Sequence, residues 1–579
     1  MGVLLQAFYQ RDNQGVPCPL DGDPGAAFWW DHLAAQAHAL RRVGFSAVWL
    51  PPLLKGASGV ASIGYDVFDD YDLGSKNQKG HVATRYGSRE QLARCVAMLR
   101  ANGIDVYADL VLNQRDGGTG TAGAVFRYVD AAGTAGKGRF PKDPSNFHFV
   151  PGGVPQDPGV FQDFSFGCDL APINGKPPGY VFNQLLASCD WQTRALDLQG
   201  FRVDDVKGVS TDFLLPLLNH GSLAGKFAVG EFFDGNLSLV QNWISNPFGM
   251  RGRSSAFDFP LRALLFQICN DAGFFDMSQL DHAGLAGADP LHAVTFVENH
   301  DTDSGPARIV QKKAQGYAYI LTSEGYPCVY YRDYSTDPGC FGLKPVIDNL
   351  IWIHEKLAQG ATQQRWKEHD VFSFERLGGP HLLVGLNNNG NVERTITVDT
   401  GFGANTELHD YSGHRGDVRT DNHGRATIVI PANANGLGYA CYSRAGIGDD
   451  FTVHGMAVTQ DYEGAADLDI EPATTGQPVQ VCRLWVSQGK AIRGALRFNT
   501  TGWTAATNLL LELIDPTGAI VGHLSYHQTT PQGEALLATA NATGWFTFRI
   551  RATEASPGQL AVTYKLSATY EAPWEVIGP

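Results

Sequence analysis

The stretch GFRVDDVKG, residues 200–208, joins a short apolar run to a cluster of charged side chains. Apolar runs of the same kind lie on both sides of it, and amphipathic helical stretches separate them through about residue 350. This alternation is typical of repeated βα units around a parallel sheet. Eight such runs favour a closed (β/α)8 barrel, the TIM-barrel arrangement. We expect the strands to begin near residues 3, 47, 105, 200, 227, 256, 293 and 328.

Three other segments depart from this alternation. Residues 114–166 are rich in Gly, Pro and Asp and too long for an ordinary βα loop, so they predict a small domain inserted after the third strand. Residues 360–446 change to short strand patterns between turn signals and predict a β-sandwich domain. Residues 447–579 predict an additional β-rich module. The barrel is thereby assigned to residues 1–113 and 167–359.

The composition of the 579 residues, 43% hydrophobic and 18% charged, is that of a globular protein in water. The formal net charge of −15 argues against nucleic acid or an anionic membrane surface as the main partner. No apolar run reaches the roughly 18 residues of a membrane span. We expect a neutral ligand and a monomer.

The nine cysteines are scattered and lack CxxC spacing, which favours neither a zinc site nor a disulfide framework, although one or two bridges stay open. The first residues, MGVLLQAFYQ, lack the basic segment and cleavage site of a secretory signal and have the pattern of a strand. The protein is therefore either cytoplasmic or exported with a signal that this chain does not contain.

Acidic side chains follow several of the predicted strands. In a parallel barrel, the residues after the strands share the rim where active sites lie. One such carboxylate is more often a helix cap, but several together repel one another and indicate acid–base or nucleophilic work, or a cation. Glycoside hydrolysis needs one ionised and one protonated carboxyl group. The acidic residues are Asp109, Asp204, Glu231 and Asp301.

The surroundings of two of these carboxyl groups differ. Arg202 lies two residues before Asp204, on the same strand face, and is expected to keep Asp204 ionised. Phe232 and Phe233 follow Glu231, and apolar neighbours are expected to raise the pKa of Glu231. The two groups are thus suited to different roles.

The acids lie in distinctive strings: DLVLNQ from Asp109, GFRVDDVKG from Gly200, VGEFFD from Val229 and FVENHD from Phe296, with GYDVFDDYDLG from Gly64 and QKGHVATRYGSREQL from Gln78 upstream. Together they resemble the α-amylase family of glycoside hydrolases over about residues 1–444. The resemblance implies a retaining enzyme that cleaves internal α-1,4-glucosidic bonds of starch or glycogen to maltooligosaccharides by double displacement.

Carried over to this chain, the resemblance makes Asp204 the nucleophile, Glu231 the general acid/base and Asp301 the transition-state stabiliser. Two of the implied substrate contacts have plainer readings, since Tyr65 can be packing at the barrel rim and Lys207 a solvated surface lysine. The residues that it implies in substrate binding are Tyr65, Asp66, Gln114, Arg202, Lys207 and His300.

Gln114 departs from the family, which usually has a histidine at this position. An amide can donate a hydrogen bond to a sugar hydroxyl, but it cannot carry positive charge. We therefore expect the binding geometry or the pH response to differ from that of the usual enzyme.

The resemblance also implies one structural Ca²⁺ between the barrel and the inserted domain, held by hard oxygen donors. Asn113, Asp163, Asp169 and the carbonyl of Gly208 match the ligand positions. The family often has histidine at position 208, but a carbonyl ligand needs no side chain. The alternative is that Asp163 and Asp169 are turn residues in a Gly-rich loop.

Two other functions stay open at this stage: a transglycosylase or branching enzyme with the same chemistry, and a catalytically inactive carbohydrate-binding relative. A polymeric substrate favours a secreted enzyme. A starch-binding role for the C-terminal module is a further hypothesis, although half or more of its aromatic rings are expected in its core. These rings are Trp485, Trp503, Trp545, Trp574, Tyr526, Tyr564 and Tyr570.

Overall fold

The computed structural model describes residues 2–11, 14–130, 132–162, 166–271, 273–448, 455–464, 478–501, 503, 507–553 and 563–575. The chain divides into two compact units. One consists of residues 1–14, 40–49 and 228–452, and the other of residues 15–39, 50–227 and 453–579.

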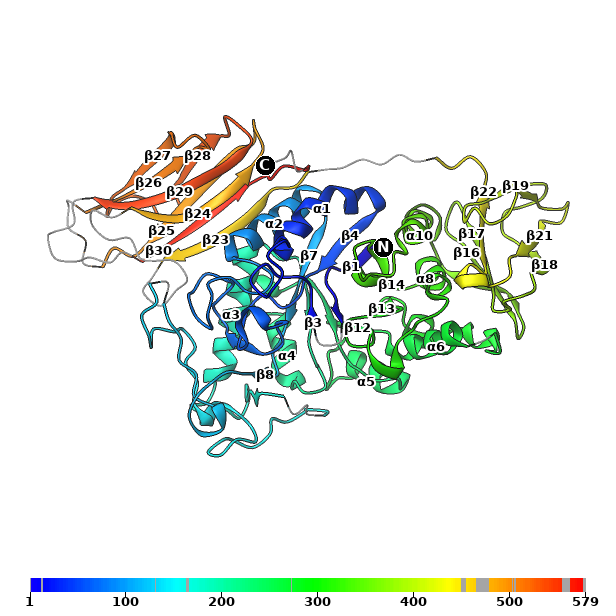
Figure 1. The fold of residues 1–579 in the computed structure, drawn as a ribbon, viewed down its shortest axis with the longest axis horizontal. Coiled ribbons are helices and arrows are strands. Elements are labelled where there is room, and N and C mark those ends of the chain that lie inside the picture. Colours follow the sequence, from blue (N-terminus) through cyan, green and yellow to red (C-terminus); the bar gives the residue numbers. More distant parts are fainter. Residues whose placement is uncertain are drawn as a thin grey trace. The chain divides into compact units, whose positions relative to one another are not determined.

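Eight parallel strands form a closed barrel in the order β1-β14-β13-β12-β11-β10-β7-β4, so the predicted fold class is confirmed (Figure 1). Their residues are almost all buried, as expected of parallel strands covered on both faces, which explains why these strands are mainly apolar. The strands are β1 (Val3–Gln6), β4 (Phe45–Trp49), β7 (Asp105–Leu110), β10 (Gly200–Val203), β11 (Phe227–Gly230), β12 (Ser255–Phe257), β13 (Ala293–Phe296) and β14 (Tyr326–Tyr330).

Helices follow most of these strands. Helix α2 starts with a complete capping box, in which Ser88 and Gln91 bond each other's main-chain N–H. Helix α1 ends just before Gly44, whose φ of +122° suits glycine. The helices are α1 (Trp29–Val43), α2 (Arg89–Ala101), α3 (Tyr180–Leu196), α4 (Thr211–Leu218), α5 (Leu237–Ser245), α6 (Phe259–Asn270), α7 (Gly284–Ala288), α8 (Lys313–Thr322), α9 (Tyr331–Tyr334) and α10 (Lys344–Leu357).

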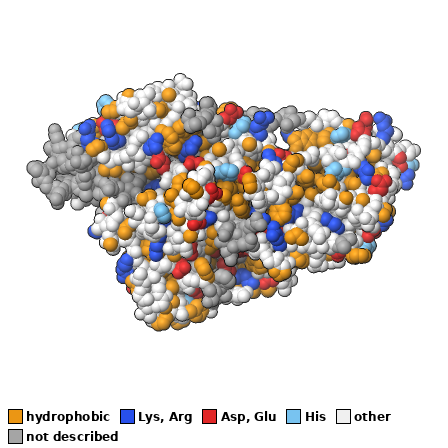
Figure 2. All heavy atoms as spheres, in the orientation of Figure 1, with side chains coloured by type: hydrophobic (Ala, Val, Ile, Leu, Met, Phe, Trp, Pro, Cys, Tyr) orange, Lys and Arg blue, Asp and Glu red, His pale blue; other side chains and the backbone are white. Residues whose placement is uncertain are grey.

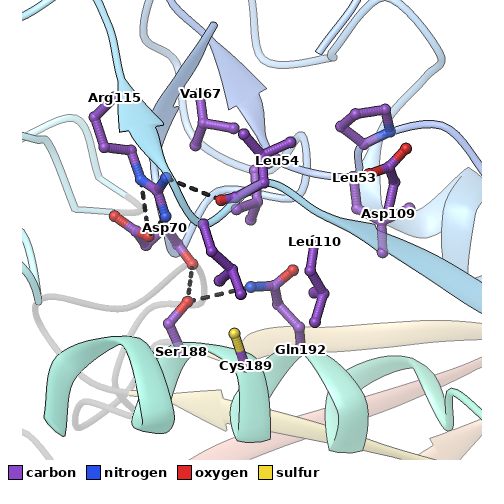
Figure 3. A pocket seen from close by; sticks show the side chains of 13 residues that line it. Leu53, Leu54, Val67, Asp70, Asp109, Leu110, Arg115, Ser188, Cys189 and Gln192 are labelled. Carbon is purple, nitrogen blue, oxygen red and sulfur yellow. Dashed lines mark hydrogen bonds and ion pairs between the residues drawn. The ribbon is translucent and has the colours of Figure 1, made fainter. Parts of the chain in front are cut away.

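The segment between β7 and α3 contains little regular structure. Two short strands, β8 (Gln114–Arg115) and β9 (Cys168–Asp169), pair antiparallel and close it at its base. Its interior holds buried charges: the guanidinium of Arg115 and the ammonium of Lys142 lie 2.5 and 2.6 Å from the two carboxylate oxygens of Asp70. Figure 3 shows Arg115 directed at Asp70, with Ser188 of α3 donating to the Asp70 carbonyl at 2.9 Å.

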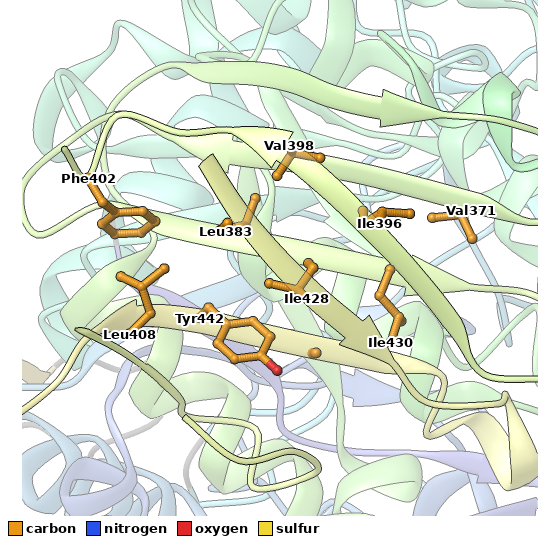
Figure 4. Packing of buried hydrophobic residues seen from close by; sticks show 11 residues of the cluster. Val371, Leu383, Ile396, Val398, Phe402, Leu408, Ile428, Ile430 and Tyr442 are labelled. Atoms are coloured by element: carbon orange, nitrogen blue, oxygen red, sulfur yellow. The ribbon is translucent and has the colours of Figure 1, made fainter. Parts of the chain in front are cut away.

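Residues 362–444 form a six-stranded antiparallel sheet, in the order β15-β16-β17-β22-β19-β20, and a separate pair, β18-β21. Strands β18 and β21 alternate buried and exposed residues, so one face, with Ile396, Val398, Ile428 and Ile430, packs into the core in Figure 4. The strands are β15 (Thr362–Lys367), β16 (Val371–Arg376), β17 (Leu382–Asn387), β18 (Arg394–Asp399), β19 (Glu407–Asp410), β20 (Val418–Arg419), β21 (Arg425–Ile430) and β22 (Tyr439–Arg444).

The C-terminal residues form two four-stranded antiparallel sheets, drawn in orange tones in Figure 1. The sheets face each other, because a Cβ added to Gly494 of one would lie 2.5 Å from the ring of Phe548 of the other. The first sheet consists of β23 (Val458–Gly464), β30 (Tyr564–Tyr570), β25 (Ala491–Phe498) and β28 (Ala535–Thr539), and the second of β24 (Val479–Val486), β29 (Gly544–Thr553), β26 (Asn508–Ile514) and β27 (Ile520–Tyr526).

Strand β23 attaches this module to helices α2 and α3 of the same compact unit. Nε2 of Gln460 donates to the carbonyl of Ala93 at 3.0 Å, and Arg89 lies 4.9 Å from the ring centre of Tyr462. Arg194 of α3 forms an ion pair with Asp461 at 2.9 Å. The module is therefore held against the barrel helices by specific polar contacts.

The aromatic rings of the module divide as expected. Trp503, Tyr526, Tyr564 and Tyr570 are buried, which confirms that at least half of the seven are core residues. Trp485 and Trp545 are half-buried beside each other, and Arg94 of α2 lies 5.1 and 5.6 Å from their ring centres. Trp574 has 42% of its surface exposed.

Three expectations about the whole chain can be compared with the structure. All nine cysteines are described and all are free, so the disulfide bridges left open by the sequence are not formed. Among the described helices, none is long and apolar enough to cross a membrane. On the face drawn in Figure 2, basic and acidic side chains are interspersed.

Candidate active site

Arg202 connects two carboxylates at the ends of β7 and β10. Arg202 and Asp109 are direct neighbours in the register of these parallel strands. Nη1 of Arg202 donates to Oδ1 of Asp109 at 2.7 Å and to Oδ1 of Asp204 at 2.5 Å. Arg202 is only 1% exposed, and these two carboxylates compensate its buried charge. The charge-assisted hydrogen bond from Arg202 also fixes the orientation of Asp204.

Tyr65 belongs to the same cluster. Its hydroxyl donates to Oδ2 of Asp109 at 2.9 Å, and its ring centre lies 5.7 Å from the Arg202 guanidinium. The neighbouring Asp66 accepts hydrogen bonds from the main-chain N–H of Ser58 and the hydroxyl of Ser62. Asp66 thus orders the loop that carries Tyr65, and the predicted substrate contact of Asp66 stays a prediction.

Gln114 supports Tyr65 from the other side. Its Nε2 donates to the main-chain carbonyl of Tyr65 at 3.1 Å, and the residue is buried. One of the two amide N–H groups that we expected to face a sugar is therefore directed at the chain itself. Lys207 is half-buried, and its main-chain carbonyl accepts hydrogen bonds from Phe161 and Gln162 of the inserted segment, at 2.8 and 2.9 Å.

His300 and Asp301 lie in the other compact unit, after β13. Nδ1 of His300 is 2.9 Å from Nε2 of Gln6, and its Nε2 is 3.3 Å from a carboxylate oxygen of Asp301. The imidazole also contacts the rings of Phe8 and Trp49, with centres 5.1 and 5.7 Å away. These contacts hold the buried His300, whereas the side chain of Asp301 is 43% exposed.

Glu298, which was not among the site residues predicted from the sequence, stabilises the turn that presents Asp301. This buried carboxylate accepts hydrogen bonds from Arg262 at 2.6 Å and from the main-chain N–H of Ile309 at 2.7 Å. Within the turn, Oδ1 of Asn299 accepts from the main-chain N–H of Asp301 at 3.0 Å. A charged residue directly after the strand run AVTFV, residues 293–297, was the available signal.

Glu231 directly follows β11 and is 8% exposed. The ring of Phe232 is buried 5.9 Å from that of Trp243, and the half-exposed Phe233 lies 4.4 Å from Phe259. Both rings therefore have packing partners of their own within the compact unit. The expected effect of these rings on the pKa of Glu231 stays a prediction.

Asn113 is a buried amide in the predicted calcium set. It is 2% exposed, and neither its Oδ1 nor its Nδ2 has a hydrogen-bond partner in the structure. A Cβ added to Gly208 would lie 2.7 Å from Asn113 Oδ1, so the amide oxygen projects toward the main chain at Gly208. A buried amide oxygen that accepts no hydrogen bond suits a hard cation such as Ca²⁺.

Of the remaining predicted calcium ligands, Asp169 lies on the strand paired with β8, and Asp163 is not described. Asp169 is the register partner of Gln114, the residue after Asn113. Asp163 lies outside the described residues. In the part of the chain that the structure describes, no three His, Cys, Asp or Glu residues gather as a metal site.

The comparisons with known proteins agree with this architecture. No family model matches the chain. The glucan 1,4-alpha-maltohexaosidase of Bacillus sp. strain 707 is 31% identical over 465 residues, which cover 71% of this chain and 86% of that protein. The alpha-amylase of Geobacillus stearothermophilus is 30% identical over 467 residues, covering 71% and 81%. The chain therefore belongs to the α-amylase family of glycoside hydrolases.

Solved structures show the likeness in fold. An alpha-amylase from Geobacillus thermoleovorans, complexed with acarbose, has a TM-score of 0.52 at 17% identity and covers 76% of this chain and 98% of its own. The gamma-CGTase of alkalophilic Bacillus clarkii has a TM-score of 0.56 at 17% identity and covers 98% and 94%. The second likeness extends over the C-terminal module as well.

Proposed function

We propose that this α-amylase family member hydrolyses internal α-1,4-glucosidic bonds of starch or glycogen, with retention of configuration, and releases maltooligosaccharides. The names of the relatives support this substrate class: one is a glucan 1,4-alpha-maltohexaosidase and several are alpha-amylases. The observation that carries the proposal is the hydrogen bond from Arg202 to Asp204, supported by Asp109.

In the proposed mechanism Asp204 is the nucleophile. Arg202 holds Oδ1 of Asp204, so attack on the anomeric carbon is assigned to Oδ2. Glu231 donates a proton to the leaving oxygen, and a covalent glycosyl-enzyme forms on Asp204. Glu231 then takes a proton from water, which attacks the anomeric carbon and restores the Asp204 carboxylate.

The strand order supports assigning these residues to one substrate. Asp204 follows β10, Glu231 follows β11 and Asp301 follows β13. In a parallel barrel the residues that follow the strands share one rim. Asp301, with its exposed side chain, is proposed to hold sugar hydroxyls as positive charge develops on the ring.

Other residues are proposed to position the sugar. His300 is fixed through Gln6 and has its Nε2 beside Asp301, and it is proposed to bond a sugar hydroxyl there. Tyr65 is held by Asp109 and offers its ring as a platform. Lys207 is proposed to contact the sugar on the leaving-group side. Gln114 acts in this scheme by placing Tyr65.

The test compares wild type with Glu231→Gln on soluble starch, following reducing ends, anomeric configuration and product sizes. Wild type is expected to release α-configured maltooligosaccharides, and the variant to lose on the order of 10³-fold in rate, because the amide cannot supply a proton. β-configured products, or a variant within tenfold of wild type, would contradict the assignment. Activity in neither protein would instead favour an inactive carbohydrate-binding relative.

Transglycosylation is a second candidate, favoured by a relative named cyclomaltodextrin glucanotransferase, from Bacillus sp. strain 38-2, which is 24% identical over 460 residues. Both reactions pass through the same glycosyl-enzyme and differ in whether water or a sugar is the acceptor. Cyclic or rearranged glucans with little gain in reducing ends would favour this candidate in the same assay.

We also propose one structural Ca²⁺, held by the oxygens of Asn113 and Asp169, the carbonyl of Gly208 and Asp163. The partnerless, buried amide oxygen of Asn113 fits such a cation, which supplies positive charge to these oxygen donors when bound. Chelator treatment is expected to lower the Tm by several degrees, because an ion bound only by the native state stabilises it. A Tm and activity that chelation leaves unchanged would refute the metal.

Finally, we propose a secreted monomer, since a polysaccharide is digested most directly outside the cell. One relative, 28% identical over 469 residues, is named the cytoplasmic alpha-amylase of Escherichia coli K12, so the family name alone does not decide the compartment. Activity confined to the cell lysate of the source organism would reverse the assignment, and light scattering of the eluting peak tests the monomer.

A further inference from the structure

Asp205 directs a second carboxylate at the space beside Gly208. A Cβ added to Gly208 would lie 2.9 Å from Oδ2 of Asp205 and 2.7 Å from Oδ1 of Asn113. Both oxygens therefore flank the same point, and a side chain at position 208 would displace one or both of them. Glycine at position 208 thus leaves this space to the two oxygens.

The local backbone holds Asp205 in this position. Its φ of +35° lies in the left-handed region, which a residue other than glycine adopts only when its surroundings impose it. The main-chain N–H of Gly208 donates to the carbonyl of Asp205 at 3.0 Å and closes a tight turn between the two residues. The turn brings Asp205 back onto the space next to Gly208.

Asn113 provides the independent sign of a ligand. Its side chain is 2% exposed, and its Oδ1 and Nδ2 have no hydrogen-bond partner. An amide oxygen and a carboxylate oxygen directed at one point are both acceptors, and they repel each other unless a cation or a donor lies between them. Two such oxygen atoms are ligands that suit a hard divalent cation.

We infer that Asp205 is an additional ligand of the proposed Ca²⁺, through Oδ2, and that Gly208 is glycine so that this carboxylate and the Asn113 amide reach the ion together. The inference rests on the calcium proposal above and adds a charged ligand to it. Each carboxylate ligand strengthens the binding of Ca²⁺. Asp205 therefore contributes to affinity, whereas the adjacent Asp204 serves the reaction.

The test is calcium titration of the full-length, chelator-treated protein by calorimetry, with the Tm followed across free Ca²⁺ concentrations. Asp205→Asn is expected to weaken the Kd for Ca²⁺ by about tenfold or more, since it removes a charged ligand. Asp212→Asn, an exposed acid in the first turn of α4, is the matched control and is expected to bind like wild type.

Gly208→Ala examines the same space without a change of charge. Its Cβ would lie within contact distance of both oxygens, and we expect a weaker Kd with an unchanged apo-protein fold by circular dichroism. If Asp205→Asn fails to fold, Gly208→Ala still tests the inference. A wild type that binds no Ca²⁺ overturns the calcium proposal and this inference together. A wild type that binds Ca²⁺, with both variants within threefold of its Kd, overturns only the role of Asp205.

Discussion

Nη1 of Arg202 donates to Oδ1 of Asp204 at 2.5 Å, and the same nitrogen donates to Oδ1 of Asp109 at 2.7 Å. One buried nitrogen thus links the proposed nucleophile to a carboxylate on the neighbouring strand. The hydroxyl of Tyr65 occupies the other oxygen of Asp109. The orientation of Asp204 consequently depends on three side chains, Arg202, Asp109 and Tyr65, none of which takes part in the bond changes.

Replacing Arg202 by Lys is expected to lower kcat on the order of 10²-fold with a small change in KM. Lysine carries the charge but cannot reproduce the planar geometry with which the guanidinium holds a carboxylate. Steady-state kinetics on a maltooligosaccharide of defined length measures both constants. Arg194→Lys, at a half-exposed ion pair on α3, controls for the substitution itself. A kcat within threefold of wild type would show that Arg202 does not orient the nucleophile.

Gln114→His is expected to remain active, within about tenfold of wild type. An imidazole N–H can replace the amide that donates to the Tyr65 carbonyl, so the loop position is preserved. Gln114→Leu removes this donor at similar size and is expected to raise KM more than the histidine variant does. The comparison is made by kinetics at several pH values, because the histidine adds a group that titrates near neutrality. Complete loss of activity in Gln114→His would mean that the pocket is built differently.

Asp70→Asn is expected to destabilise the protein by about 3–5 kcal/mol, because Arg115 and Lys142 would remain buried with no carboxylate between them. Burial raises the pKa of Asp70, but Arg115 and Lys142 outweigh it and hold the pKa well below its ordinary value of 3.8. A carboxyl group whose pKa is depressed by folding stabilises the protein at pH values above its pKa in the unfolded state. This stabilisation disappears as the pH falls through its pKa in the folded state.

Denaturant unfolding monitored by fluorescence measures this effect at pH 7 and at several pH values below about 4. The difference between wild type and Asp70→Asn is expected to be largest at pH 7 and to shrink as Asp70 becomes protonated. Asp399→Asn, at an exposed position of β18, is the control and should stay within about 0.5 kcal/mol of wild type. A difference that does not depend on pH would argue against the ion pairs.

Trp574→Ala is expected to reduce retention of the full-length protein on insoluble starch several-fold and to leave hydrolysis of short soluble substrates unchanged. Trp574 is exposed, and its main-chain carbonyl is fixed by Asn102 at 2.9 Å, so its ring is available to stack on a sugar. Leu537→Ala, the control, removes another exposed apolar side chain of the same module, which is 73% exposed. Equal retention of wild type and both variants on starch would show that Trp574 does not bind the polysaccharide.

The sequence predicted the barrel well because parallel strands buried on both faces must be apolar along their length, as at Val3–Gln6 and Ala293–Phe296. It predicted the carboxylates because they lie at or shortly after the ends of those strands, as Asp204 and Glu231 do directly after β10 and β11. It did not show that strand β23, within the predicted β-rich module, attaches this module to α2 and α3. Its residues, Val458–Gly464, include Gln460, Asp461 and Glu463, and their partners Ala93 and Arg194 are hundreds of positions away.

By itself, the sequence determined the class of fold, the positions of the strand-end acids and the family, because these depend on local periodicity and short motifs. Only the tertiary structure decided which partners these residues take. Gln114 supports Tyr65, Asp66 orders its own loop, and Asp205 shares a space with Asn113 across the turn at Gly208. The physical reason is that hydrogen bonds and ion pairs join groups distant in the chain, and their geometry is set only when the elements pack.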